Sequence, residues 1–173
     1  VALGIMVANL CVYKSGFEEH SEELGKFAED GQEIKEFLVN AIDEDTNAFD
    51  KVIKAMRMPN DSDSEKKIRA EKMQEGYKSA AEVPLLVVEY CYRALNTCDR
   101  ISKIMDDSMA SDVGSGAQMS IAGARAAAYN VKINLKTITD KEYTSKTNKK
   151  LEKLLSECER VLQIVIKRVE KKF

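Results

Sequence analysis

The scarcity of helix breakers is the feature that most constrains how this chain can fold. Its 173 residues include only 2 Pro and 8 Gly, and apolar residues recur at three- and four-residue steps over long stretches. That period is typical of amphipathic α-helices, and no segment alternates with the period of a half-buried strand. The sequence therefore predicts an all-α protein, a single bundle of about five long helices forming one domain over residues 1–173.

Five segments carry the helical pattern. They are Val1–Val12, a run from about Glu18 to Met58, a stripe from Ile68 to Met105, the small-residue segment Val113–Leu135, and a last run from about Ser145 to Lys172. Val1–Val12 does not open with a Met and has no cap or basic lead, and it is shorter than the roughly 20 residues that span a bilayer. We expect it to be a buried helix whose first turns precede this sequence, and we expect no membrane association.

Proline and polar residues predict where the second helix ends and how the third behaves. Pro59 ends the second helix, because the residue before a proline is displaced from the helical region. Ser62 and Glu65 have the spacing of a capping box for the third. Pro84 lies within the third helix, where it removes one hydrogen bond and crowds the carbonyl of Ala80, so we expect a kink there.

The composition excludes several classes of function. Lys plus Arg total 27 and Asp plus Glu 29, a net charge of −2, which lacks the basic excess of nucleic-acid-binding proteins. With 1 His, multi-histidine metal sites and most histidine-based triads are excluded, and no metal is expected. The four cysteines form no CxxC pair and lie among apolar residues, which favours buried reduced thiols in a cytoplasmic protein.

One acid interrupts an apolar stripe in the second segment. With Leu38 at zero and about 100° per residue, Asp45 falls about 20° away, whereas Asp43 falls about 140° away. A buried carboxylate costs several kcal/mol unless it is paired or neutralised. We therefore expect Asp45 to be either a structural acid paired with a buried cation or a functional carboxylate that moves protons or grips a ligand.

Other polar residues are candidates for ligand binding. Asn130 and Asn134 lie on one face of the small-residue helix, and each carboxamide suits a heterocycle as well as a neighbouring helix end. Arg57 lies where the second helix ends, and its cation suits a carboxylated ligand or the helix C-terminus. Ser111 or Asp112 is expected to cap the small-residue helix.

Seven motifs, taken in order, resemble those of a known family. They are Ala41–Asp50, Ala55–Pro59, Met73–Gly76, Ala81–Leu85, Ser111–Asp112, Tyr129–Leu135 and Ile138–Asp140. Together with Met6–Leu10, they resemble the cyclodeaminase/cyclohydrolase family, which comprises the C-terminal domain of formiminotransferase-cyclodeaminase and its free-standing bacterial relatives. The resemblance covers nearly the whole chain. The Pro- and Gly-rich run with which the family normally opens is not found here.

The resemblance implies an enzyme that acts on a tetrahydrofolate derivative and needs no other cofactor. The family converts 5-formiminotetrahydrofolate to 5,10-methenyltetrahydrofolate with release of ammonia, in histidine degradation, or interconverts methenyl- and 10-formyltetrahydrofolate with water. The implied partner is a formiminotransferase domain or enzyme. The helical wheel favours Asp45 as the catalytic acid/base, and the motif residues expected to bind substrate are Asp43, Arg57, Ser111, Asp112, Asn130 and Asn134.

Three functions follow as hypotheses from these observations. The first is a formiminotetrahydrofolate cyclodeaminase, because one carboxylate in an apolar setting can move a proton and stabilise the developing methenyl cation. The second is a methenyltetrahydrofolate cyclohydrolase. The third is a non-catalytic helical interaction module, which the missing glycine-rich run favours.

The apolar surface also predicts assembly. The helix 113–135 has small side chains on nearly all faces, and Val1–Val12 is apolar on nearly all faces. A single five-helix bundle has too few neighbouring helices to cover both surfaces completely. The resemblance implies a homodimer with folate sites near the subunit interface. We therefore expect a two-fold, helical dimer interface.

Overall fold

Four long helices make up the computed structural model, which describes Met6 and residues 18–173. The all-α prediction is confirmed, since these residues contain no strand. They form four long helices in place of the predicted number of about five. Except for Met6, the predicted helix Val1–Val12 lies outside the described residues. The helices are α2 (Ser21–Met56), α3 (Asp63–Ile104), α4 (Ala110–Leu135) and α5 (Lys141–Val169), with 3₁₀ turns at Glu18–His20, Asp107–Met109 and Glu170–Lys172.

Local signals set most helix ends. The predicted capping box is present, with Glu65 N–H donating to Ser62 Oγ (3.2 Å) and Ser62 N–H to Glu65 Oε2 (2.8 Å). Asp140 caps α5 by accepting from Tyr143 N–H (3.0 Å). The predicted cap of α4 is wrong: α4 begins at Ala110 without a side-chain cap. Ser111 therefore lies inside the first turn.

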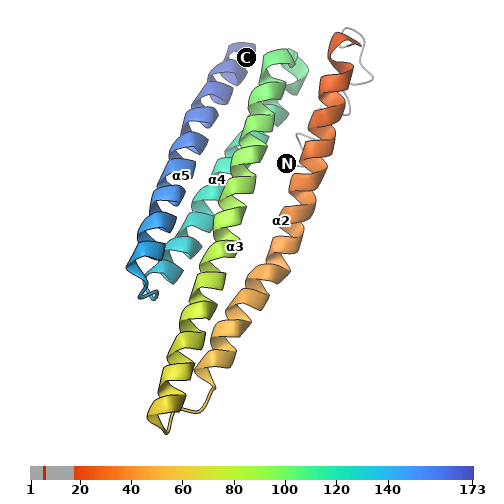
Figure 1. Cartoon of the computed structure of the whole chain (residues 1–173). Helices are drawn as coiled ribbons and strands as arrows, with labels where there is room; N and C mark the ends of the chain where they lie inside the picture. The colour runs from red at the N-terminus through yellow and green to blue at the C-terminus, as the bar shows by residue number, and fades with distance from the viewer. Residues whose placement is uncertain (1–5, 7–17) are drawn as a thin grey trace.

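α3 is the central element of the bundle. It packs against α2, α4 and α5, and α4 and α5 also pack against each other. Figure 1 shows α2 and α3 as a long antiparallel hairpin whose tip extends beyond the turn that joins α4 to α5. The largest fully buried side chains come from all four helices. They include Phe27 and Ile34 of α2, Leu95 of α3, Val131 of α4 and Leu151 of α5.

Pro84 does not interrupt α3. The helix continues through it as one element from Asp63 to Ile104, so the kink predicted at Pro84 does not divide the helix. The carbonyl that Pro84 leaves without a backbone partner, Ala80 O, accepts instead from Asn134 Nδ2 of α4 (2.9 Å). A neighbouring helix thus supplies the missing donor.

Candidate functional site

Asp45 is exposed, which overturns the expectation that it points into the core. The apolar stripe on which it lies is only half covered. Ala41 and Val52 are buried at 6% and 1% exposure, whereas Ile42 and Phe49 are 68% and 54% exposed. Asp45 therefore lies at the edge of the covered half, and no cation among the described residues pairs with it.

The incomplete cover has a geometric cause. The buried face of α2 follows alternating steps of three and four residues, the narrow seam of a helix that packs against one partner. Its members are Leu24, Phe27, Gly31, Ile34, Ala41, Ala48, Val52 and Ala55. Because α3 is the only long helix with which α2 packs extensively among the described residues, the wider part of the stripe stays uncovered.

The level of Asp45 along α3 follows from the closest approach of the two helices. A Cβ on Gly76 would lie 3.0–3.2 Å from side-chain and backbone atoms of Val52, so these two residues face each other. The helices are antiparallel, and Asp45 precedes Val52 by about two turns. Asp45 therefore lies level with Val83, about two turns beyond Gly76.

Asn130 and Asn134 reach the same level from α4. Asn134 Nδ2 donates to Ala80 O and to Asn130 O, both at 2.9 Å. Asn134 is thus level with Ala80, and Asn130 lies about one turn, or roughly 5 Å, further along. The structure therefore brings Asp45, Asn130 and Asn134 to one level of α3.

The same three residues also lie on one side of α3. Lys51 Nζ donates to Ser79 Oγ across one side of the α2–α3 seam (3.1 Å). On α2, Asp45 is about 120° from Lys51, with the seam between them, and on α3 Ala80 is about 100° from Ser79. Asp45 and the asparagines therefore share the side opposite the Lys51 contact, which we call the shared flank.

Exposed apolar side chains surround these polar groups. Ile42 and Phe49 lie one turn on either side of Asp45. On α4, Ile133 is 57% exposed and lies about 60° around the helix from Asn130, while Tyr129, at 73% exposure, lies further round on the outer face. None of the four was predicted as a site residue, and Ile42 and Phe49 belong to the apolar stripe that was expected to face the core. Their combination with a carboxylate and carboxamides suits a flat, partly apolar ligand.

The other predicted site residues lie elsewhere. Asp43 is exposed about 160° around α2 from Asp45, and Arg57 is the C-cap of α2, about 18 Å along the helix. Ser111 and Asp112 lie at the opposite end of α4, about 27 Å from Asn130. A single chain therefore does not bring them to the shared flank, and their binding roles stay predictions.

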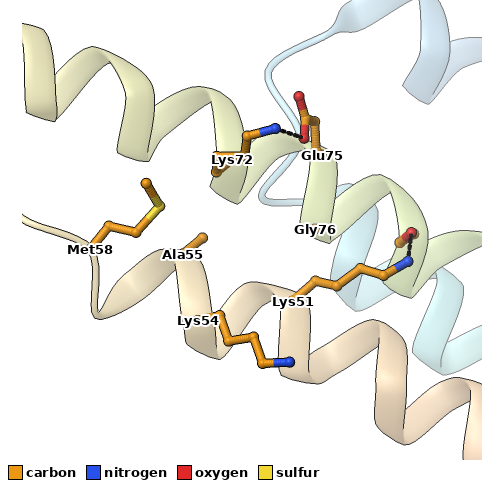
Figure 2. A pocket seen from close by; sticks show the side chains of 8 residues that line it. Lys51, Lys54, Ala55, Met58, Lys72, Glu75 and Gly76 are labelled. Atoms are coloured by element: carbon orange, nitrogen blue, oxygen red, sulfur yellow. Dashed lines mark hydrogen bonds and ion pairs between the residues drawn. The ribbon is translucent and has the colours of Figure 1, made fainter.

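A pocket near the tip of the hairpin lies on the opposite flank (Figure 2). It has a volume of about 470 Å³ and is lined by Lys51, Lys54, Ala55, Met58, Lys72, Glu75, Gly76 and Ser79. Two of its ammonium groups already have partners, since Lys72 pairs with Glu75 at 2.7 Å and Lys51 with Ser79. None of the predicted site residues lines it.

The described cysteines are core residues. Cys91, Cys98 and Cys158 are buried, and burial raises the pKa of Cys91 and Cys98 to about 11 and that of Cys158 to about 12. Thiols with such pKa values stay protonated at neutral pH and are poor nucleophiles. Among the described residues, no group of three or more His, Cys, Asp or Glu side chains could hold a metal ion.

No helix in residues 18–173 has both the length and the apolar run needed to cross a membrane.

Comparison with known proteins identifies the class. A family model described as formiminotransferase-cyclodeaminase matches residues 1–153. A methenyltetrahydrofolate cyclohydrolase from Methylorubrum extorquens is 33% identical over 172 residues, covering 97% of this chain and 83% of that protein. The formimidoyltransferase-cyclodeaminase of Gallus gallus is 29% identical over 171 residues, which is 99% of this chain but only 32% of that longer protein.

A solved structure shows the same fold. The crystal structure of formiminotetrahydrofolate cyclodeaminase from Thermotoga maritima matches with a TM-score of 0.87 at 28% identity, covering 98% of this chain and 81% of that chain. The fold and these matches define a helical domain of folate one-carbon metabolism. The chain belongs to the formiminotransferase-cyclodeaminase family, as its sequence motifs predicted.

Proposed function

We propose that this chain is a formiminotetrahydrofolate cyclodeaminase, which forms 5,10-methenyltetrahydrofolate and releases ammonia. The observation that carries the proposal is the shared flank, where Asp45 lies level with Asn130 and Asn134 among exposed apolar side chains. The relative from Thermotoga maritima bears this activity in its name. A cytoplasmic role in histidine degradation accompanies the proposal.

The carboxylate of Asp45 supplies the proton transfer that cyclodeamination needs. N10 of the substrate attacks the carbon of the protonated formimino group, a C–N bond forms while the C=N double bond becomes a single bond to an NH2 group, and the Asp45 carboxylate accepts the N10 proton. When the bond from that carbon to the exocyclic nitrogen breaks, Asp45 returns the proton and ammonia leaves. The negative charge near the new methenyl cation lowers the barrier further. No step requires another cofactor.

The surrounding residues suit the rest of a folate. The pterin and aminobenzoyl rings are flat and apolar with polar edges, and Phe49 of α2 and Ile133 of α4 offer exposed apolar surface beside Asp45 and Asn130. The Asn130 carboxamide is exposed and offers both a donor and an acceptor to a ring edge.

A methenyltetrahydrofolate cyclohydrolase is the second candidate, because the relative from Methylorubrum extorquens has that name. In that reaction the same carboxylate would deprotonate the attacking water. The discriminating experiment supplies 5-formiminotetrahydrofolate and records ammonia together with methenyl absorbance. Release of both identifies the cyclodeaminase. Hydrolysis of the methenyl compound alone identifies the cyclohydrolase, and absence of saturable folate binding identifies a non-catalytic module.

A homodimer completes the proposal. A second copy would cover the exposed apolar side chains Ile42, Phe49, Tyr129 and Ile133. Ser111 and Asp112, which lie too far from the shared flank of their own chain, would in such a dimer contribute to the site of the partner. Light scattering at micromolar concentration should give a dimer mass, and a monomer mass would contradict this assembly.

A formiminotransferase domain or enzyme is the proposed source of substrate.

A further inference from the structure

We propose that Asn134 is a positioning residue: its amide replaces the backbone N–H that Pro84 lacks and thereby holds Asn130 level with Asp45. The inference rests on the proposed function, because it concerns residues of the same site. It assigns the substrate contact to Asn130 and the placement of Asn130 to Asn134.

The first link is the carbonyl of Ala80. In an α-helix this carbonyl would accept from the N–H four residues later, but that residue is Pro84, which has no N–H. Asn134 Nδ2 donates to it at 2.9 Å from the neighbouring helix. Because of the proline, the Ala80 carbonyl of α3 is available to accept a hydrogen bond from α4. This contact lies at the level of Asp45.

The second link is the backbone of Asn130. The other N–H of the Asn134 amide donates to Asn130 O at 2.9 Å, so both hydrogens of Nδ2 are in use, and within residues 18–173 only Oδ1 has no partner. The Asn130 side chain is exposed and makes no hydrogen bond to another described residue. One amide thus ties the backbone of α3 to the backbone of the residue that is free to bind a ligand.

Contacts other than those of Asn134 also hold the C-terminal end of α4 against α3. The turn after α4 is held by Gln74, whose Nε2 donates to Thr137 O (3.0 Å) and whose Oε1 accepts from Thr139 N–H (2.8 Å). Lys78 also pairs with Asp140 at 2.7 Å. Gln74 fastens the same end of α4 about one and a half turns from Ala80, which makes Gln74→Ala a matched control.

The test uses Asn134→Ala, Pro84→Ala, their double variant and Gln74→Ala, with Tm and steady-state folate kinetics measured for each. Asn134→Ala should lower Tm by about 3–8 °C, because it leaves a carbonyl without a donor. The double variant should have the same Tm as Pro84→Ala, because in both proteins the backbone N–H of residue 84 again donates to Ala80 O. KM should rise about tenfold in both variants that lack Asn134. Gln74→Ala should lower Tm but leave KM within about twofold.

Three results would overturn parts of this scheme. If the Tm changes of Asn134→Ala and Pro84→Ala are additive in the double variant, the Asn134 amide does not replace the missing donor to Ala80 O. An equal rise in KM for Gln74→Ala would mean that any loosening of α4 has the same effect, so that Asn134 holds no special position. A wild-type chain without folate turnover or binding would overturn the proposed function and the positioning role together, while a coupled Tm cycle would still establish the Pro84–Asn134 pairing.

Discussion

The two sides on which α3 meets α4 and α2 are packed in different ways. On the α4 side, small residues let the helices approach closely: a Cβ on Gly123 would lie 3.2 Å from Cys91 Sγ, and one on Gly116 would lie 3.6 Å from Cys98 Sγ. Both thiols are buried. The buried residues of α3 and α4 form one continuous hydrophobic core.

On the α2 side, a narrower buried seam is accompanied by polar and aromatic contacts at the surface. Arg93 donates to both carboxylate oxygens of Glu33 at 2.8 and 3.1 Å, and Phe37 stacks on Tyr90 with ring centroids 3.6 Å apart. Exposed ion pairs contribute little to stability, and Ile42 and Phe49 are left exposed.

The difference teaches where to look for function in this fold. The helix α4 packs on both α3 and α5 and has a continuous buried face, and its exposed apolar side chains, such as Tyr129 and Ile133, lie outside that face. A helix that packs on α3 alone keeps part of its stripe, with Asp45 in it, available to a ligand or a second subunit. The candidate site therefore lies where packing is incomplete.

The largest effect expected from this comparison is on turnover. Asp45→Asn should lower kcat by roughly 10²–10⁴-fold, the range for loss of a general acid/base. Tm should change little, because the side chain is exposed. Asp50→Asn, an exposed acid on the same helix, is the control and should keep near-full turnover. Near-full turnover in Asp45→Asn would remove the chemical role from the shared flank.

The next largest effect concerns the one place where α2 does approach α3 closely. Gly76→Ala would place a Cβ 3.0 Å from Val52 Cγ2 and 3.1 Å from its backbone nitrogen, an overpacking that costs roughly 1–3 kcal/mol. Calorimetry should show Tm lowered by several degrees. Gly25→Ala meets nothing within 4 Å and should raise Tm slightly, because alanine favours the helix. An unchanged Tm in Gly76→Ala would mean that the seam is looser than the structure shows.

The smallest effect tests the tight α4 side through pH. Burial raises the pKa of Cys98 from 9.0 to about 11, so the folded state favours the neutral thiol. Its stabilising contribution is complete below pH 9 and is lost as pH rises towards 11. Between pH 8 and 10.5, the wild type should therefore lose more Tm than Cys98→Ala does. Equal losses in the two proteins would show that this thiol is hydrated in the folded state.

Much of the fold could be predicted because its signals are local. The scarcity of breakers, the capping box at Ser62 and Glu65 and the stop before Pro59 each act within one helix. The burial of Asp45 was predicted wrongly, because a helical wheel shows how wide an apolar stripe is but not how much of it a partner covers. That depends on how many helices pack against α2.

The candidate site could be predicted only in part for the same reason. Asn134 and the Ala80 carbonyl that Pro84 frees were both recognised, but local sequence does not say that α4 meets α3 at that level. Arg57 and Ser111 match family motifs, but their distances from the shared flank depend on how the helices pack, which the motifs do not specify.

The most direct test of the account is a double-mutant cycle in kcat/KM between Asp45→Asn and Asn130→Ala. If both side chains act on one bound folate, the double variant should be less impaired than the product of the single effects, by about tenfold. The same cycle between Asp45→Asn and Gln74→Ala, a residue off the site, should be multiplicative. Multiplicative effects for Asp45 and Asn130 as well would contradict the claim that these two residues of different helices form one site.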